Sequence, residues 1–401
     1  MRALLFTHLF PSQYEPTRGV YNLRGFGALA SFCDVEIVVP VAAWRRVRRP
    51  RDWGRRVVET HAGLVATYPT FWNVPRIGML AHPEAMYRSA RRRALELNRE
   101  RPFDAILGAF AYPDVVAAAK LAQELNVPLV AFVLGSDMNV LAQRPELRDQ
   151  IRAALLQAHS VVAVSEGLRS RALELGIPPD RVIVQHNGVD GECFQLRDSH
   201  AARRMLGIPT HERVISFVGN LVHEKGPDVL IEAAARLYSS GASDLRVLFA
   251  GRGRDEDDLR AKAVALGIGE RVKFLGRLTA TEVAVCISAA DVQCLPSRRE
   301  GCPNVVLEAL ASGRPVIGSA VGGVPELLSD RNGIMIPPDD PDALAAAITA
   351  ALERKWDPAD LRASVPSLTW NDLGRALHNE LERAVRSHRS TAARTRETAR
   401  T

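Results

Sequence analysis

Short apolar runs alternate with helix-length stretches along the whole chain. Runs rich in Val, Ile and Leu predict buried strands at 3–6, 35–39, 105–107, 129–133, 160–164 and 182–185. Helical stretches such as 115–125 and 166–175 lie between them. Strands that alternate with helices in this way are typical of a parallel sheet covered by helices. The pattern therefore predicts a doubly wound α/β fold.

The same pattern repeats in the second half of the chain. A second set of strands is predicted at 214–218, 246–250, 272–275, 292–295 and 315–318. We therefore expect two Rossmann-like domains, residues 1–195 and 196–369, joined in the polar stretch that interrupts the strand pattern between Asn187 and Pro209. Ligands of open parallel sheets bind outside the carboxyl ends of the strands, so two facing sheets would form an interdomain cleft for two substrates.

The end of the chain lies beyond this double pattern. A last helix is predicted over residues 370–385, and we expect it to return to the first domain. Residues 386–401 are mainly Arg, Ser, Thr and Ala, with one His and one Glu and no core-forming side chain, so a disordered tail is expected there.

Composition narrows the class of protein. With 401 residues, 47% of them apolar and 24% charged, the chain is predicted to be globular and soluble, not disordered or collagenous. Its five cysteines are widely spaced without a C-x-x-C, so neither a disulfide framework nor a zinc site is predicted. His8 and Pro11 interrupt the first apolar stretch too early for a signal peptide, and no apolar run approaches a membrane span. We expect a cytoplasmic protein whose membrane contact, if it has one, is peripheral.

Positive charge is concentrated near the start of the chain. The net charge is +6, and residues 1–150 carry the whole excess. Its densest part, residues 44–56, has two tryptophans and seven arginines, and Arg91, Arg92 and Arg93 follow. Such a patch attracts anions such as lipid headgroups, nucleic acid or a phosphorylated substrate. The alternative is a solvated loop in a chain that uses arginine in place of lysine.

The most informative chemistry lies in residues 296–309. Glu300 lies in a Gly/Pro turn after a predicted strand, and Glu308 lies eight positions later on the helix that follows. The N-terminus of that helix favours a phosphate, whereas carboxylates accept hydrogen bonds from sugar hydroxyls. Together they predict a nucleotide-sugar site. Taken alone, Glu308 could serve the helix dipole and Glu300 could be an exposed loop charge.

The wider string is far more specific than either carboxylate. Residues 297–309 read Ser-x-x-Glu-Gly-x-Pro-Asn-Val-x-Leu-Glu-Ala, followed by Ala-Ser-Gly-Arg-Pro-Val-Ile at 311–317 and Val-Gly-Gly-Val-Pro-Glu at 321–326. Val-Ala-Val-Ser at 162–165, Gln-His-Asn-Gly-Val-Asp at 185–190, Phe-Val-Gly-Asn-Leu at 217–221, Glu-Lys-Gly at 224–226 and Ala-Gly-Arg-Gly at 250–253 precede it. This series resembles the retaining family 4 glycosyltransferases, formerly group 1, over about residues 1–385.

The resemblance implies the GT-B fold, with a nucleotide-sugar donor on the C-terminal domain and the acceptor mainly on the N-terminal one. It implies a hexosyltransferase that uses a UDP- or GDP-linked sugar and needs neither cofactor nor metal. Glu308 resembles the residue that binds the ribose, Glu300 the one near the donor sugar, and Lys225 the lysine on the diphosphate. A cation is needed there because the leaving group gains charge. A solvated loop lysine is the alternative for Lys225.

Further site residues follow from position in the family. The donor-binding residues implied are Glu308, Gly19, Asn220, Arg252, Arg277, Gly301, Cys302, Pro303, Asn304 and Val305, and the acceptor-side residues are Tyr112, Ser136 and Asn139. Asp137 is a third candidate catalytic residue beside Glu300 and Lys225, although a Ser-Asp pair before a polar loop is equally typical of a turn or cap.

Two positions depart from the family. Many relatives have Arg where this chain has Asn220, so one diphosphate cation is either missing or supplied by Arg252, Arg254 or Arg298. The family's His-Gly-Ser-Asp loop has Leu134 at its histidine position, so no role of that histidine carries over. Asp255-Glu256-Asp257 resembles a metal-binding D-x-D motif, but it lies at a predicted helix start, where acids favour the dipole.

The acceptor and the competing functions are less defined. A weaker resemblance to the teichuronic-acid and cell-surface polysaccharide subgroup favours a lipid-linked glycan acceptor, while a soluble metabolite or a natural-product aglycone remains an alternative. A nucleotide-sugar 2-epimerase shares the architecture, but the Glu300/Glu308 string argues against it. A basic nucleic-acid scaffold is a third hypothesis, although no nucleic-acid module is present. Since the G-x-G-x-x-G fingerprint is absent, a dehydrogenase is not predicted.

Overall fold

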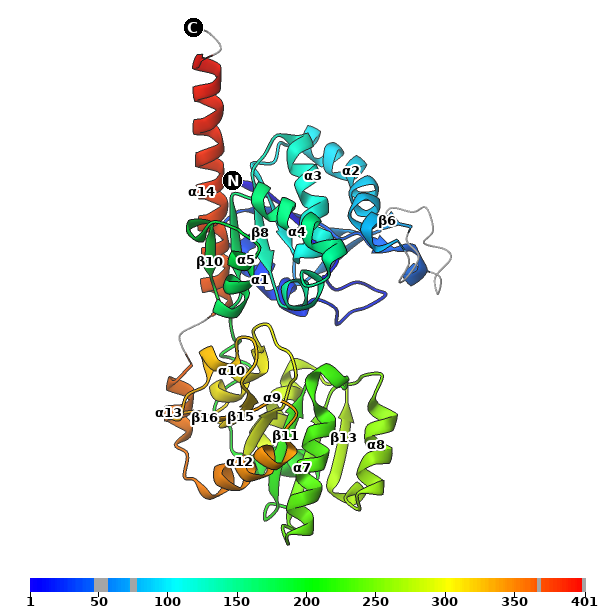
Figure 1. Ribbon diagram of the computed structural model, residues 1–401, viewed down its shortest axis with the longest axis vertical. Coiled ribbons are helices and arrows are strands. Elements are labelled where there is room, and N and C mark those ends of the chain that lie inside the picture. Colours follow the sequence, from blue (N-terminus) through cyan, green and yellow to red (C-terminus); the bar gives the residue numbers. More distant parts are fainter. Residues whose placement is uncertain (47–56, 73–77, 366–368, 399–401) are drawn as a thin grey trace. The chain divides into compact units, whose positions relative to one another are not determined.

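The protein consists of two compact units. The computed structural model describes residues 1–46, 57–72, 78–365 and 369–398. Unit 1 contains Met1–Gly188 and Trp370–Thr401, and unit 2 contains Val189–Thr369 (Figure 1). The division falls seven residues before the expected boundary at 195/196. The reason is that Phe194, 1% exposed, packs into a hydrophobic core of unit 2.

Unit 1 is built on an eight-stranded sheet with the order β10-β9-β8-β7-β1-β2-β5-β4. Every pair in it is parallel except β4 with β5. A separate two-stranded sheet pairs β3 with β6. The strands are β1 (Arg2–Phe6), β2 (Asp34–Val38), β3 (Val41–Ala42), β4 (Val58–His61), β5 (Leu64–Thr67), β6 (Thr70–Phe71), β7 (Ala105–Ala109), β8 (Leu129–Val133), β9 (Ser160–Ala163) and β10 (Val182–Val184).

Helices cover this sheet, so that strands β1, β7, β8 and β9 are buried along their whole length. Its helices are α1 (Val20–Ala30), α2 (His82–Glu100), α3 (Val116–Leu125), α4 (Pro145–Gln157), α5 (Glu166–Glu174) and α14 (Trp370–Thr398). Short turns occur at η1 (Ala43–Arg46), η3 (Met79–Ala81), η4 (Ala111–Val115), η5 (Asp137–Leu141) and η6 (Pro179–Arg181).

Helix α14 returns to unit 1, as expected, and it is longer than expected. It packs on α1 and against β7, β8 and β9, with Leu373 close to Gly25 (Figure 1). The disordered tail predicted from residue 386 is wrong for 386–398, which continue the helix to Thr398. His388 contacts the Asn126 carbonyl at 3.1 Å and Arg389 pairs with Asp104 at 2.7 Å, so polar contacts to unit 1 take the place of apolar burial there.

Unit 2 is built on a six-stranded, wholly parallel sheet with the order β13-β12-β11-β14-β15-β16. Its strands are β11 (Arg213–Val218), β12 (Leu245–Ala250), β13 (Val272–Gly276), β14 (Val292–Leu295), β15 (Val316–Ser319) and β16 (Gly333–Ile336). Its helices are α6 (Ser199–Leu206), α7 (Pro227–Ser239), α8 (Glu256–Ala265), α9 (Ala280–Ala289), α10 (Asn304–Ala311), α11 (Val324–Leu327), α12 (Pro341–Glu353) and α13 (Pro358–Ala363), with turns η7 (His223–Lys225) and η8 (Gly269–Arg271).

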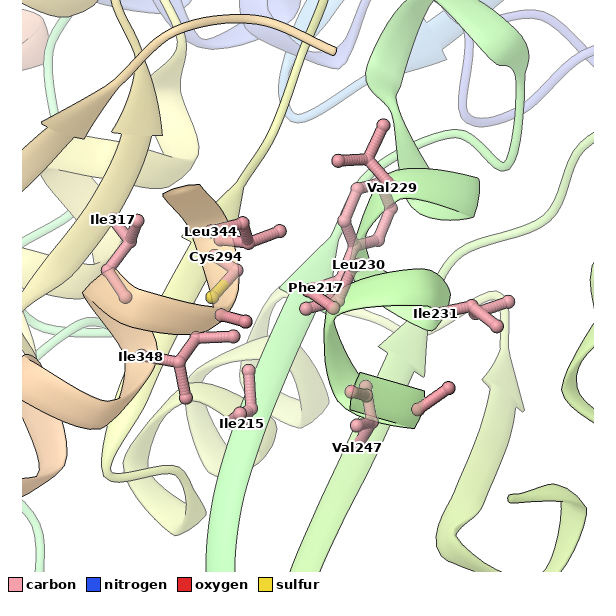
Figure 2. Packing of buried hydrophobic residues seen from close by; sticks show 14 of the residues in the cluster. Ile215, Phe217, Val229, Leu230, Ile231, Val247, Cys294, Ile317, Leu344 and Ile348 are labelled. Atoms are coloured by element: carbon pink, nitrogen blue, oxygen red, sulfur yellow. The ribbon is translucent and has the colours of Figure 1, made fainter. Parts of the chain in front are cut away.

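Both faces of this second sheet are packed. On one face, Ile215 and Phe217 of β11 meet Leu230 of α7 and Leu344 and Ile348 of α12 (Figure 2). On the other, residues of α9 and α10 form a second cluster. Continuous apolar strands between two helical layers are what a parallel sheet requires. The predicted pair of Rossmann-like domains is therefore confirmed.

Three other expectations concern the whole chain. All five cysteines are free. No helix among the described residues is long and apolar enough to span a membrane. Residues 47–56, which hold five arginines of the basic stretch 44–56, lie outside the described residues.

Candidate functional site

The site predicted from the motif lies in loops at the carboxyl end of the second sheet. The loop after β11 contains Lys225, and the loop after β14 contains Glu300. Since β11 and β14 are parallel neighbours, both loops leave the sheet at the same edge. Gly226 makes their contact possible, because it has a φ of 65° and a Cβ there would lie 2.0 Å from the Pro296 carbonyl oxygen.

Lys225 and Glu300 form an ion pair at this edge. The Lys225 ammonium donates to both Glu300 carboxylate oxygens at 2.7 Å, and the Ser297 hydroxyl donates to Oε1 at 2.7 Å. The Glu300 side chain is only 4% exposed, whereas that of Lys225 is 30% exposed. A nearly buried carboxylate therefore holds a lysine whose ammonium group can still reach a ligand. The role of Ser297 was missed, although the Ser-x-x-Glu spacing contains it.

Helix α10 begins at Asn304, as the motif predicts, with Pro303 as its N-cap residue. Glu308 lies in its second turn and is 8% exposed. Every residue of α10 is buried, and the amide of Gly323 donates to the Gly301 carbonyl at 2.8 Å to fix the preceding turn. The start of the helix, where positive backbone charge concentrates, is thus held beside the turn that carries Glu300 and Cys302.

The candidate phosphate-binding cations differ in how they are engaged. Arg298 is held by Asp228 at 2.8 and 2.9 Å and also contacts Asp339, so it braces the loops. Burial opposes ionisation of Asp228, but the hydrogen bond and charge of Arg298 outweigh it and lower the pKa of Asp228. Arg254 pairs with Glu224 at 3.4 Å.

Arg252 differs from these two arginines. It is exposed in the loop after β12, and its side chain makes no hydrogen bond or ion pair within the chain segments that the structure describes, although its backbone carbonyl accepts from the Leu221 amide at 3.1 Å. Asn220 and Arg277 are exposed after β11 and β13. Of Arg252, Arg254 and Arg298, Arg252 therefore has the side chain least engaged by other residues.

The Asp255-Glu256-Asp257 sequence lies at the start of α8, which begins at Glu256 and carries acids in its first turn. The prediction that it is a helix start is confirmed. No cluster of three or more potential metal ligands occurs within the described parts of the chain.

In unit 1, the geometry of Asp137 favours the turn-stabilising alternative over a catalytic role. Its side chain is fully buried, and it accepts hydrogen bonds from the amides of Ala111 at 2.8 Å, Gly135 at 2.6 Å and Leu134 at 3.2 Å. Burial raises the pKa of Asp137, although these amides act in the opposite direction. A carboxylate enclosed in this way ties the loops after β7 and β8 together and is not presented to a substrate.

The acceptor-side residues are placed differently from one another. Tyr112 is 1% exposed and its hydroxyl donates to the Met79 carbonyl, so the structure places it in the core, where burial raises its pKa to about 12. Ser136 is exposed and Asn139 is half-buried on the turn after β8. Only these last two are open to an acceptor.

Gly19 is explained by its own loop. It has a φ of 64°, and a Cβ there would lie 2.1 Å from the Leu9 carbonyl oxygen. Close packing on Leu9 therefore requires glycine whether or not a phosphate binds nearby. Its role at the donor stays a prediction.

A histidine-aspartate pair beside this loop was missed. The Nδ1 atom of His8 lies 2.6 Å from Oδ2 of Asp114, and Asp114 is fully buried. His8 follows β1 and Asp114 lies in η4 after β7, two parallel neighbours. Both residues follow predicted strands in the sequence, and this position could have indicated that they lie at the same edge of the sheet.

Two family models match the chain. The model described as glycosyl transferases group 1 matches residues 198–365. The model described as glycosyltransferase family 4 matches residues 28–192. The first match lies within unit 2, and the second covers most of the part of unit 1 that precedes unit 2 in the chain.

Relatives extend this likeness. A protein of Bacillus subtilis named as a teichuronic acid biosynthesis glycosyltransferase, TuaC, is 30% identical over 370 residues, which are 89% of this chain and 91% of that protein. A D-inositol 3-phosphate glycosyltransferase of Mycobacteroides abscessus is 36% identical over 221 residues, which are 53% of this chain and 48% of that protein.

Solved structures share the fold. Anabaena Alr3699/HepE, determined in complex with UDP, has a TM-score of 0.68 at 19% identity over 99% of this chain and 100% of that one. A sucrose-phosphate synthase from Thermosynechococcus elongatus has a TM-score of 0.73 at 22% identity over 98% of this chain and 99% of that one.

Proposed function

This chain belongs to the group 1, or family 4, glycosyltransferases, which use nucleotide-sugar donors, and we propose that it transfers a hexose from a UDP- or GDP-linked donor with retention of configuration. The observation that carries the proposal is the ion pair between Lys225 and Glu300 at 2.7 Å, at the carboxyl edge of the second sheet. Lys225 lies in the Glu-Lys-Gly motif at 224–226 and Glu300 in the motif at 297–309, both of which carry the family resemblance.

The donor is assigned to unit 2. Lys225 binds the diphosphate, and its ammonium group stabilises the negative charge that develops as the bond to the sugar breaks. Arg252 supplies a second cation in place of the arginine missing at Asn220. The first turn of α10 adds partial positive charge, and Glu308 accepts hydrogen bonds from the ribose hydroxyls. These groups together provide charge stabilisation that does not depend on a metal ion.

Glu300 has two roles in this scheme. Because it contacts Lys225 through both oxygens, it holds the ammonium group in place before the donor binds. Such preorganisation avoids reorientation at the moment of reaction. Glu300 also supplies negative charge beside the donor sugar, where positive charge develops in an oxocarbenium-like transition state.

The acceptor is proposed to be a hydroxyl of a glycan, because the relative TuaC is named for teichuronic acid biosynthesis. A small-molecule acceptor is the alternative, since the mycobacterial relative is named for D-inositol 3-phosphate. UDP is the first nucleotide to test, because it is the ligand named with the Anabaena structure.

The experiment measures binding of UDP, GDP and ADP by the shift in unfolding temperature. A nucleotide at 100 times its dissociation constant should stabilise the protein by about 2.7 kcal/mol. We expect UDP or GDP to do so, and expect Lys225→Met and Arg252→Met each to weaken that binding tenfold or more, since a hydrogen bond to a charged group contributes about 1.5–3 kcal/mol.

Arg254→Met is the matched control, because Arg254 is already paired with Glu224. It should bind the nucleotide as the wild type does. The proposed donor site would be contradicted if the wild type bound no nucleotide. It would also be contradicted if all three variants bound the nucleotide with equal affinity.

A further inference from the structure

Unit 1 contains a cavity of about 260 Å³ beside the carboxyl ends of β1 and β2. Sites that enclose a drug-sized ligand measure about 300–1,000 Å³, so this one fits a single sugar ring or a headgroup. Its polar lining comes from separate elements: His8 follows β1, Arg18 precedes α1, Arg45 lies in η1, and His82 begins α2.

We propose that this cavity is an acceptor subsite and that it selects an acceptor bearing an anionic group, a phosphate or a carboxylate. Arg18 and Arg45 bind the anion, and His8 accepts a hydrogen bond from an acceptor hydroxyl. The inference rests on the proposed glycosyl transfer and deepens it by naming the class of acceptor.

The two arginines share one carboxylate on the cavity wall. Both Arg45 and Arg18 contact Glu15, the second at 3.6 Å. Their side chains are 20% and 25% exposed, and burial lowers the pKa of each. For Arg18 the charge of Asp114 opposes this effect without cancelling it. Taking these cations out of water is thus incompletely compensated within the chain, and an anionic ligand would complete the compensation.

The hydrogen-bonding capacity of the two side chains supports the same conclusion. A guanidinium has five N–H donors in a planar fork that matches a phosphate or a carboxylate. Among the described residues, Arg18 uses Nε to donate to the His8 carbonyl at 3.2 Å and Nη1 to meet Glu15, and Arg45 meets Glu15 through Nη1. The Arg45 guanidinium also stacks on Trp44, 4.8 Å from the ring centroid. Further donors of both forks are available to a ligand.

His8 has a defined orientation. Its backbone amide donates to one Asp114 oxygen and its Nδ1 lies 2.6 Å from the other, while Phe110 packs edge-on against the ring at 5.5 Å. A carboxylate accepts hydrogen bonds, so Nδ1 carries a proton, and in the uncharged form of the ring Nε2 is a hydrogen-bond acceptor. Since the side chain is 20% exposed and lines the cavity, Nε2 can receive a hydroxyl.

His82 is the second imidazole of the cavity. Burial lowers its pKa, and the neighbouring His8 acts in the same direction. His82 is therefore neutral at pH 7, and the positive charge that faces a ligand comes from Arg18 and Arg45, offset by Glu15. An anion-binding subsite of this kind should remain active well above pH 7.

The test compares binding of D-glucose 6-phosphate, D-glucuronate and D-glucose to the full-length protein by calorimetry, with UDP present at saturation to occupy the donor site. We expect at least one of the two anionic sugars to bind tenfold or more tightly than glucose. The first two probes distinguish phosphate from carboxylate. Equal affinity for all three sugars, or no binding by any, would overturn the proposal without reference to a variant.

Variants separate this subsite from the donor site. Arg18→Met and Arg45→Met should weaken binding of the anionic sugar tenfold or more and leave UDP binding unchanged. Arg92→Met is the matched control, because Arg92 is a 91% exposed arginine on α2. If the two variants instead lost UDP and kept the anionic sugar, the arginines would belong to the donor diphosphate and the proposal would be wrong.

Two further outcomes separate the proposals. If the wild type bound neither UDP nor GDP, the proposed donor would be refuted, while the comparison among sugars would still decide the cavity's preference. Arg18→Lys, which keeps the charge and loses the planar fork, should retain part of the affinity if the variant is folded and the subsite binds an anion.

Discussion

Lys225 and Glu300 depend on each other. A carboxylate that is 4% exposed is costly to leave unpaired, and the lysine and Ser297 together supply its hydrogen bonds. Replacing Lys225 therefore changes the environment of Glu300 as well as the charge offered to a diphosphate. Effects at the two positions should be non-additive, as expected for groups in one hydrogen-bonded network.

Glu300→Gln and Glu308→Gln should differ in which kinetic constant they change. A ribose contact is made equally in the ground and transition states, so Glu308→Gln should raise the donor KM about tenfold with little change in kcat. Glu300→Gln loosens Lys225 and removes charge at the reacting sugar, so kcat should fall about 10²–10³-fold. Both constants are measured by nucleotide release.

Glu353→Gln is a control for these two substitutions, since Glu353 is exposed at the far end of α12. It should behave as the wild type. Wild-type kinetics in both site variants would show that the motif carboxylates do not contact the donor.

The sequence predicted the positions of site residues correctly where the spacing of residues within a motif is sufficient to place them. Glu300, Lys225 and the start of α10 lie together as the motif indicated. Asp137 and Tyr112 could not be judged in this way, because what decides their role is burial and backbone hydrogen bonding by residues far along the chain. The His8–Asp114 pair was missed for the same reason: 106 residues separate its members, and only the adjacency of β1 and β7 joins them.

At the scale of elements, the long buried strands were predicted, whereas of the four edge strands of the two large sheets β10 and β13 were predicted and β4 and β16 were not. The predicted strands of both sheets coincide with observed ones within two residues. Parallel strands buried on both faces read as continuous apolar runs, which is a strong signal. Strand β16 is short and only partly buried, and β4 alternates exposed and half-buried residues at the sheet edge. Such strands are defined by their pairing partner more than by their own composition.

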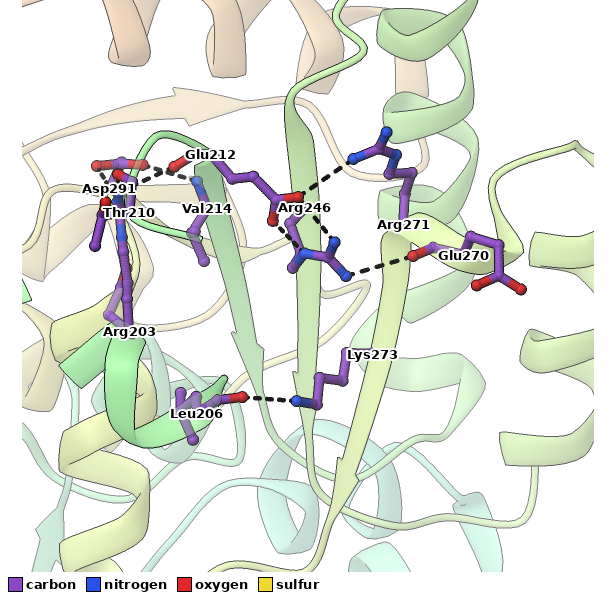
Figure 3. A network of polar contacts seen from close by, with 11 residues as sticks. Arg203, Leu206, Thr210, Glu212, Val214, Arg246, Glu270, Arg271, Lys273 and Asp291 are labelled. Atoms are coloured by element: carbon purple, nitrogen blue, oxygen red, sulfur yellow. Dashed lines mark hydrogen bonds and ion pairs between the residues drawn. The ribbon is translucent and has the colours of Figure 1, made fainter. Parts of the chain in front are cut away.

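A polar network joins the amino-terminal ends of the second sheet, opposite the candidate donor site. Glu212 contacts Arg246 and Arg271, while Arg203 donates to the carbonyls of Ala289 and Glu212 at 2.9 and 3.0 Å (Figure 3). Because these residues lie in α6, α9, β12 and η8 and immediately before β11, the network fixes the positions of elements relative to one another within unit 2.

Glu212→Gln should destabilise unit 2 in a pH-dependent way. Hydrogen bonding from Arg246, and then its charge and that of Arg271, lower the pKa of Glu212 below its ordinary 4.5, against burial. A lowered pKa contributes stability that is present above pH 4.5 and is lost as the pH falls through the folded-state pKa. We expect the variant to be about 1–3 kcal/mol less stable at pH 7. The difference should shrink as the pH is lowered below 4.5.

Urea unfolding of both proteins between pH 7 and pH 3 measures this effect. Asp342→Asn is the control, because Asp342 is 79% exposed and its pair with Arg236 should contribute at most about 1 kcal/mol. A pH-independent difference between Glu212→Gln and the wild type would contradict the assigned cause.

For the whole molecule, the uneven charge predicts where an anionic surface would bind. We propose that the basic stretch 44–56 brings the enzyme to anionic bilayers, with its tryptophans at the interface. Each cation near such a surface contributes about 1 kcal/mol, so replacing Arg48, Arg49 and Arg51 by Gln should weaken co-sedimentation with anionic vesicles about 100-fold at low salt. Neutral vesicles are the control. If vesicle binding is absent, or is unaffected by salt, the proposal is wrong and the alternative of a solvated stretch without a ligand holds.

The stereochemical outcome depends on whether either candidate carboxylate, Asp137 or Glu300, can act as a nucleophile. Double displacement needs an accessible carboxylate nucleophile. Asp137 is fully buried among backbone amides, and Glu300 is bound to Lys225 and Ser297. We therefore expect a same-face route, in which the leaving phosphate accepts the proton of the incoming hydroxyl and Lys225 and Arg252, in the proposed roles, stabilise its charge.

From an α-linked nucleotide sugar, this route predicts an α-linked product, formed equally well in the presence of EDTA. NMR of the product measures the configuration through the coupling constant of the anomeric proton. Glu300→Gln should lower the rate without changing that configuration, since in this route Glu300 forms no bond to the sugar. A β-linked product would refute the same-face route, whereas loss of activity on chelation would show that side-chain cations and helix amides do not suffice. Trapping of a sugar on Asp137 or Glu300 would establish double displacement instead.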